Sequence, residues 1–175
     1  MPETDGGWQP VSATSEPFPD YNTPKELTTQ EVYELIDQWV EAGKRSIAAG
    51  FDMIEIHAAH GYLVHQFLSP LTNQRADEFG GSAENRARFL VEIVKSMRAA
   101  IGEKYPILIR FSVTDYHPEG FTVSDAAQVA RWCHEVGADL FDISSGGLIT
   151  GVKIPIGPGY QVPLSEEMSK GVDAP

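Results

Sequence analysis

The stretch Phe51–Tyr62, FDMIEIHAAHGY, decides the fold of this chain. Its first half is an apolar run typical of a buried strand, and its second half places two imidazoles and a phenol where that strand ends. In α/β proteins, ligands bind at the carboxyl ends of parallel strands. Two histidines spaced three apart can converge on one electron-rich atom, and Tyr62 adds a proton donor. The stretch therefore predicts a strand that leads into a site for polarising and protonating a small molecule.

Helical and strand patterns alternate on both sides of this stretch. Thr28 and Glu31 have the spacing of a capping box, and an apolar face of helical period follows them. The expected elements are a helix from Thr28 to a stop at Gly50, a strand at 52–57, a helix at 84–101, a strand at 107–112, a helix capped by Ser124 and running to Val136, a strand at 138–144, and a short helix at 164–169. Strict alternation with apolar strands predicts a parallel sheet with helices outside it.

The domain plan has two parts. Residues 1–27 hold five prolines and are expected to form an extended loop, whereas residues 28–175 are expected to form one segment of a single domain. The loops expected at 58–83 and 145–163 follow strands and are long, which is typical of functional loops. Three strands cannot close a barrel, so the unit is either a small open sheet or part of a larger barrel.

Composition limits the classes of function. A net charge of -12 argues against nucleic acid binding, which depends on clustered Lys and Arg. No stretch approaches the roughly 18 apolar residues of a membrane span. Cys133 is the single cysteine, so no disulfide within the chain is possible. With no secretory leader apparent, a reducing, cytoplasmic setting is the expectation.

His57 and His60 are the first candidate site residues. Each imidazole can donate an N–H to a carbonyl or nitro oxygen where negative charge develops. The alternatives are that they are helix-capping or core histidines, or that they chelate a metal. A metal needs a third ligand, and no cysteine or histidine stands at a companion spacing, since His65 is five residues further on.

Tyr62 and Arg110 are the other two candidates. Tyr62 is either a general acid or a half-buried aromatic that packs. Arg110 lies inside an apolar strand, where a guanidinium requires either an anionic ligand or an internal salt bridge, for instance to Glu55. Small residues at 144–147 fit either a tight turn or a close approach of backbone to a ligand. The chain contains neither the Gly-rich dinucleotide fingerprint nor a nucleophile elbow.

Several blocks of sequence, in order, resemble the old yellow enzyme family. They are Glu55–Leu63, Gln66–Pro70, Asn73, Arg75, Asp77–Ser82 and Glu84–Arg86. This family consists of FMN-dependent ene-reductases with a TIM (β/α)8 barrel, and the His-x-x-His pattern is similar to its thermophilic-like bacterial branch and fungal relatives. The resemblance covers roughly residues 8–165 and implies a partial barrel.

The resemblance also implies roles for the four candidates. His57 and His60 would bind the carbonyl or nitro oxygen of an activated alkene. Tyr62 would lie over the flavin as proton donor or orienting neighbour. Arg110 would contact the N1/C2-carbonyl edge of FMN and stabilise the reduced ring.

By the same resemblance, the strands would be the fourth, fifth and sixth of eight, and residues 1–27 would be the loop after the third. Other strands would carry a flavin-contacting Gln, a redox-tuning Cys that Cys133 does not replace, and the Gly and Arg residues that hold the FMN phosphate.

Three functional hypotheses follow. The first is an FMN-dependent oxidoreductase that reduces activated C=C bonds of enones or nitroalkenes with NADPH or NADH. The second is a non-catalytic or assembly-dependent half-barrel fragment without the FMN phosphate site. The third is a relative of 2,4-dienoyl-CoA reductase. The expected partner is a small activated alkene, with no nucleic acid and no membrane, and with a second copy or a complementing barrel segment as a further possibility.

Overall fold

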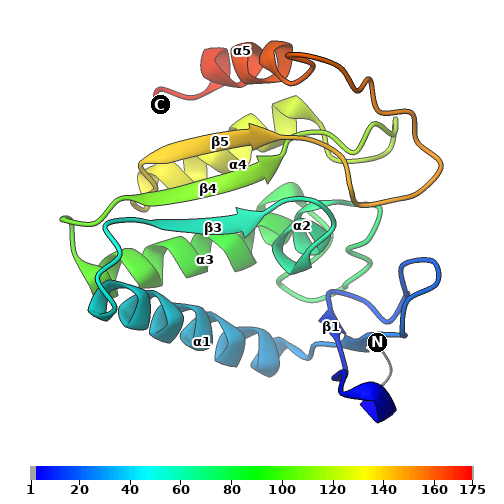
Figure 1. Ribbon diagram of the computed structural model, residues 1–175, viewed down its shortest axis with the longest axis horizontal. Coiled ribbons are helices and arrows are strands. Elements are labelled where there is room, and N and C mark those ends of the chain that lie inside the picture. The colour runs from blue at the N-terminus through cyan, green and yellow to red at the C-terminus, as the bar shows by residue number, and fades with distance from the viewer. Residues whose placement is uncertain (1–2, 175) are drawn as a thin grey trace.

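The computed structural model describes residues 3–174, and its centre is a parallel sheet of three strands (Figure 1). Strands β3, β4 and β5 follow one another in the sheet in chain order. All three point towards the end of the molecule where α2 and the connecting loops lie. The elements are η1 (Glu3–Asp5), β1 (Val11–Ser12), β2 (Lys25–Glu26), α1 (Thr29–Ala48), β3 (Ile54–Ala58), α2 (Leu63–Leu68), α3 (Ala83–Ile101), β4 (Ile107–Ser112), α4 (Val123–Glu135), β5 (Leu140–Ser144) and α5 (Val162–Gly171). The expected parallel α/β unit is confirmed.

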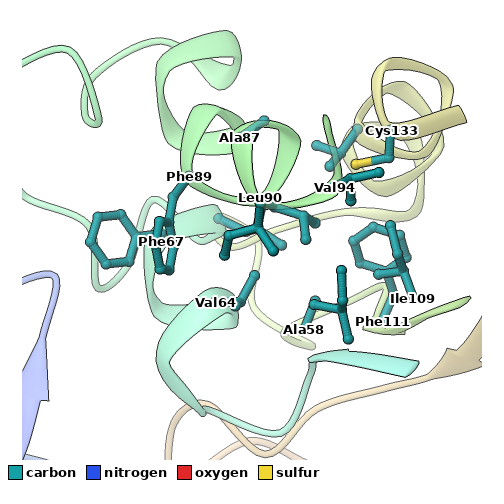
Figure 2. Packing of buried hydrophobic residues seen from close by; sticks show 14 of the residues in the cluster. Ala58, Val64, Phe67, Ala87, Phe89, Leu90, Val94, Ile109, Phe111 and Cys133 are labelled. Carbon is teal, nitrogen blue, oxygen red and sulfur yellow. The ribbon is translucent and has the colours of Figure 1, made fainter. Parts of the chain in front are cut away.

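The two faces of the sheet differ because side chains alternate along each strand. One face is apolar and buried against α1, α3 and α4, with Ile56, Ile109 and Phe111 fully buried (Figure 2). Burying side chains of this size contributes roughly 1.5–3 kcal/mol each. The opposite face carries side chains that keep part of their surface exposed, namely Glu55, His57, Leu108, Arg110, Leu140 and Asp142. The polar residues of the sheet are therefore gathered on the face away from the main helices.

Two helices begin with a capping box. The box at Thr28 and Glu31 is confirmed, with the Glu31 N–H donating to Thr28 Oγ1 at 3.3 Å and the Thr28 N–H donating to Glu31 Oε2 at 3.0 Å. The prediction that Ser124 caps α4 is wrong. Thr122 is the cap, because it forms a second capping box with Asp125. The Thr122 N–H donates to Asp125 Oδ2 at 3.0 Å, and the Asp125 N–H donates to Thr122 Oγ1 at 3.2 Å.

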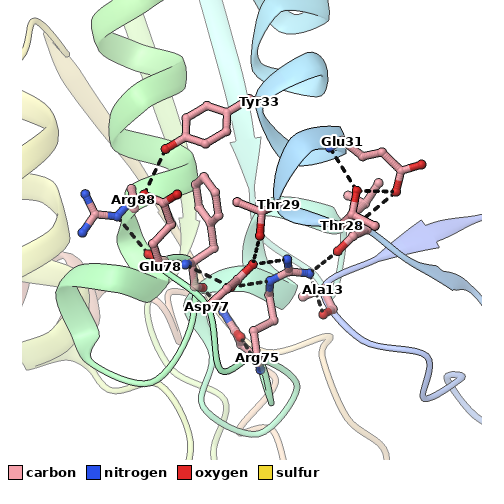
Figure 3. A network of polar contacts seen from close by, with 12 residues as sticks. Ala13, Thr28, Thr29, Glu31, Tyr33, Arg75, Asp77, Glu78 and Arg88 are labelled. Atoms are coloured by element: carbon pink, nitrogen blue, oxygen red, sulfur yellow. Dashed lines mark hydrogen bonds and ion pairs between the residues drawn. The ribbon is translucent and has the colours of Figure 1, made fainter.

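Residues 3–27 are more ordered than an extended loop. β1 and β2 pair in parallel, and a buried arginine from the loop at 69–82 joins them to the rest of the fold (Figure 3). Arg75 donates to the backbone carbonyls of Ala13 and Leu27 and forms an ion pair with Asp77. Asp77 in turn accepts a hydrogen bond of 2.6 Å from Thr29 of α1. This cluster gives the charged loop a structural role away from the candidate site residues.

The segment expected to be a long loop at 58–83 contains a short helix, α2. It spans six residues, Leu63–Leu68, and buries Val64, His65, Phe67 and Leu68. Six residues form less than two turns, so their helical period gave no signal above that of an apolar loop.

The opposite end of the sheet is fastened by Arg98, near the end of α3. Its guanidinium donates to the carbonyls of Gly102, Tyr105 and Gly137 and pairs with Asp139 at 2.5 Å.

Among the described residues, no helix is both long and apolar enough to cross a membrane.

Candidate active site

A row of three polar side chains crosses the exposed face of the sheet near its carboxyl end. His57 of β3, Arg110 of β4 and Asp142 of β5 are register partners. Arg110 Nη1 lies 3.1 Å from Asp142 Oδ2. The internal salt bridge that was one of the two alternatives for Arg110 is therefore present, but its partner is Asp142 and not Glu55. Glu55 lies opposite Leu108 in the register, whereas Asp142 stands directly beside Arg110.

His60 is held in a tight turn just beyond β3. Its φ is 58° and that of Gly61 is 76°, so two successive residues adopt the left-handed conformation. The His60 N–H donates to Ser112 Oγ at 3.0 Å, and His60 Nε2 lies 2.7 Å from Ser144 Oγ. A Cβ on Gly147 would lie 2.8 Å from His60 Cα, so the loop after β5 touches this turn backbone to backbone.

The turn brings three of the predicted site residues together. The ring centres of His57 and His60 are 5.2 Å apart, and those of His57 and Tyr62 are 5.3 Å apart. Tyr62 is 64% exposed, so its side chain lies largely outside the core. Arg110 is beside His57 in the sheet register. All four candidates therefore share one end and one face of the sheet.

Electrostatics favour neutral imidazoles in this cluster. Burial lowers the pKa of His57, and the neighbouring Arg110 cation lowers it further. Burial also lowers the pKa of His60, with added repulsion from His57 and Arg110. A neutral imidazole has one N–H donor and one acceptor nitrogen. His57 can therefore offer one N–H to a ligand oxygen, and His60 can offer its Nδ1–H when Ser144 donates to its Nε2.

Arg110 provides a test of whether the residues fit a flavin. Its Nε is buried and has no hydrogen-bond partner within residues 3–174, although Asp142 pairs with the other end of the guanidinium. A buried donor without an acceptor costs roughly 1–3 kcal/mol. The orphaned N–H fits the acceptor edge of a bound isoalloxazine. No group of three or more His, Cys, Asp or Glu in the described part of the chain is arranged to hold a metal ion.

The site also includes Asp142, Ser112 and Gln161, which the sequence reasoning missed, and Ser144, which it gave only as part of the small-residue stretch 144–147. Asp142, Ser112 and Ser144 contact the predicted residues directly, and the Gln161 side-chain amide donates to Ser144 Oγ at 3.1 Å. A signal for the first three exists in the strands themselves. Ser112 and Arg110, like Ser144 and Asp142, are two positions apart and so share a face.

A groove of about 980 Å³ lies next to the turn. Gly61 and Gln66 line it, together with the N-terminal segment around Trp8 and Phe18 and the loop around Leu148. The groove is largely apolar, and Gly61 lines it whereas His57 and His60 do not.

The comparisons with known proteins agree on one family. The model of the NADH:flavin oxidoreductase / NADH oxidase family matches residues 4–170. An NADPH dehydrogenase of Geobacillus sp. (strain WCH70) is 46% identical over 169 residues, which cover 96% of this chain and 48% of that protein. An NADH:flavin oxidoreductase of Gibberella zeae is 47% identical over 161 residues, which cover 85% of this chain and 39% of that protein.

Solved structures give the same result for the fold. A 2-naphthoyl-CoA reductase in complex with 2-naphthoyl-CoA superposes with a TM-score of 0.87 at 36% identity, covering 95% of this chain and 26% of that one. The old yellow enzyme homologue of Zymomonas mobilis gives a TM-score of 0.80 at 26% identity, covering 100% and 52%. The chain thus spans from about a quarter to about half of the length of these relatives, and residues 3–174 do not form a closed barrel.

Proposed function

Because the chain belongs to the NADH:flavin oxidoreductase / NADH oxidase family, we propose that it forms the substrate-binding part of an FMN-dependent oxidoreductase. The electron donor is NADPH or NADH, and the acceptor is the activated C=C bond of an enone or nitroalkene. The observation that carries this proposal is the convergence of His57 and His60 beside Arg110, whose Nε lacks an acceptor.

Arg110 is the flavin contact in this proposal. Bound FMN would supply hydride transfer between the nicotinamide and the alkene. A fixed guanidinium beside the pyrimidine edge favours negative charge there, in the manner of a preorganised cation. Asp142 holds the guanidinium at 3.1 Å, and its position in the register keeps the arginine on the exposed face.

His57 and His60 bind the substrate oxygen. Both pKa values are lowered, so each ring can donate one hydrogen bond without carrying a full charge. Two donors on one carbonyl or nitro oxygen draw electron density from the conjugated double bond and favour hydride addition at the β-carbon. Tyr62, exposed and 5.3 Å from the His57 ring, supplies the proton for the α-carbon.

We place the protein in the cytoplasm, where the lone, buried Cys133 remains a thiol.

Two alternatives each have an observation in their favour. In the described residues β3 and β5 are sheet edges, and an open edge favours pairing with a second copy or a complementing barrel segment. This supports an assembly-dependent half-barrel. The likeness to a 2-naphthoyl-CoA reductase supports a thioester substrate, as in the dienoyl-CoA hypothesis.

Flavin binding by the purified chain tests the proposal. We expect FMN fluorescence to be quenched on titration, and NADPH to be oxidised when cyclohexenone is added. Arg110→Gln should weaken FMN binding about tenfold, the loss of one charge-assisted hydrogen bond. The matched Arg45→Gln, on the exposed side of α1, should bind as the parent does. A chain that binds no FMN and oxidises no NADPH would refute catalysis by this chain alone and favour the assembly-dependent alternative.

A further inference from the structure

A buried histidine–aspartate pair lies beneath the His60 turn and belongs to none of the roles described above. His65 of α2 and Asp115 of the loop after β4 both have fully buried side chains. His65 Nε2 lies 2.9 Å from Asp115 Oδ1, an ion-pair contact in which neither atom has the geometry of a hydrogen bond within residues 3–174. Buried ionisable groups are costly unless they are fully hydrogen-bonded, so their other partners show what the pair does.

Asp115 is held as an acceptor. Its Oδ2 accepts from Ser69 Oγ at 2.6 Å and from the Phe121 N–H at 2.7 Å. Burial alone would raise the pKa of this carboxyl, but the neighbouring His65 and the hydrogen bonds from Ser69 and Phe121 outweigh burial and lower it. A carboxylate can only accept, so its closeness to His65 Nε2 favours a proton on that nitrogen.

The other nitrogen of His65 reaches the turn. Nδ1 accepts the Gly61 N–H at 3.1 Å, which requires that Nδ1 carries no proton. The next residue of α2, Gln66, donates to the Gly61 carbonyl at 2.7 Å. The helix therefore holds both polar groups of the glycine that follows His60. A non-glycine residue in the left-handed region is strained by roughly 1–3 kcal/mol, so such a turn needs this support.

We propose that His65 and Asp115 are positioning residues for His60. Asp115 fixes the Nε2–H tautomer of His65, and that tautomer keeps Nδ1 free to hold the Gly61 N–H and with it the left-handed turn. Neither residue touches the ligand. The functional meaning rests on the proposed function, because His60 is there the substrate-binding imidazole, whereas the hydrogen bonds do not depend on it.

Asp115→Asn separates this role from simple packing. The Phe121 N–H can only donate, so it keeps the amide oxygen of Asn and turns the NH2 group towards His65 Nε2. Two donors would then face each other unless the His65 proton moves to Nδ1. A proton on Nδ1 would point at the Gly61 N–H, so Nδ1 could no longer accept its hydrogen bond. The substitution changes almost no volume yet removes the hydrogen bond to the turn.

NMR of the ¹⁵N-labelled chain tests the proposal without flavin or substrate, so its failure is distinct from failure of the proposed function. We expect a scalar coupling across the hydrogen bond between the Gly61 nitrogen and His65 Nδ1. Ser69→Ala, which leaves the carboxylate in place, should keep the coupling. Asp115→Asn should lose it, shift the His65 proton to Nδ1 and move the His60 ring resonances. Absence of the coupling in the parent, or its persistence in Asp115→Asn, would overturn the proposal.

A second pair of variants applies if Asp115→Asn does not fold. His65→Asn places an amide oxygen near the position of Nδ1, and His65→Leu fills a similar space without an acceptor. We expect slow hydrogen exchange of the Gly61 amide in His65→Asn and exchange at least tenfold faster in His65→Leu. Equal exchange rates in the two variants would contradict a positioning role for His65.

Discussion

At Gly61, the absence of a side chain lets two loops of the site meet. A Cβ there would lie 2.5 Å from the Gly147 carbonyl oxygen, and the φ of 76° is already unfavourable for other residues. Gly61→Ala therefore combines backbone strain of about 1–2 kcal/mol with a clash against rigid backbone. We expect it to lower the free energy of unfolding by at least about 2 kcal/mol more than Gly81→Ala.

Gly81 is the matched control because its φ of 80° is similar and a Cβ there would meet nothing within 4 Å. Urea unfolding of both variants measures the difference. Equal losses of stability would show that the contact with Gly147 does not matter.

His57→Ala addresses substrate binding at the same scale. Removing one donor from a developing oxyanion costs roughly 2.7–4 kcal/mol in other enzymes, or a 100- to 1000-fold lower kcat. We expect a loss of this order in FMN-dependent reduction of cyclohexenone by a protein that contains the chain. His134→Ala, on the exposed surface of α4, should leave the rate unchanged. A His57→Ala variant with full activity would exclude His57 from the substrate contact.

At the scale of elements, the start of α4 distinguishes two hydroxyl residues. Thr122 accepts from the Asp125 N–H at 3.2 Å, whereas Ser124 lies inside the helix. Thr122→Ala should therefore lower the free energy of unfolding by about 1 kcal/mol, the typical value of an N-cap. Ser124→Ala should change it little, and thermal melting of both variants provides the comparison. A larger loss of stability in Ser124→Ala than in Thr122→Ala would show that Ser124 is the N-cap, as the sequence suggested.

Element prediction succeeded where a long periodic pattern existed. β4 has the predicted bounds, and α1 and α3 begin within one residue of them, because apolar period and caps agree there. β3 begins at Ile54 rather than residue 52, since the sheet ladder starts with the Ile54 N–H donating to the Pro106 carbonyl. That bond joins two segments far apart in the chain, so the local sequence does not indicate it. The local sequence likewise does not decide whether Thr122 or Ser124 is the N-cap.

For the whole molecule, the shifted pKa values predict loss of stability in acid. The hydrogen bond from Arg75 lowers the pKa of Asp77 from 3.8 to about 2, against burial. Its stabilisation is complete above the unfolded value and is lost as pH falls towards the folded one. The lowered pKa values of His57 and His60 reduce stability at a higher pH than Asp77 does. Below about pH 6.5 these histidines bind protons more readily in the unfolded chain than in the folded chain.

We therefore expect stability to decline slightly below pH 6.5 and steeply between pH 4 and 2. Asp77→Asn should lose about 1–2 kcal/mol at pH 7 and show a shallower acid decline. Asp52→Asn, on an exposed loop, is the control. Urea midpoints between pH 7 and pH 3 measure both. A parent whose midpoint is the same at both pH values would contradict this account.

The grouping of the candidate residues was predictable from the sequence, but their contacts were not. His57, His60 and Tyr62 follow directly from one strand end, and the structure places them together. The partner of Arg110 was misjudged because the sequence does not state which residue of β5 stands beside it in the sheet. The sequence argument considered His65 only as a metal ligand. Its contact with Asp115 was not visible there, because Asp115 lies in a loop 50 positions further along the chain.

The row formed by His57, Arg110 and Asp142 has a consequence for folding itself. If one strand paired one residue out of step, its polar side chain would turn into the apolar layer under the helices. Burying a charged group without its partner costs several kilocalories per mole. Misregistered sheets would thus be penalised strongly by these three side chains. The polar row then protects the register of the sheet, whatever ligand the sheet binds.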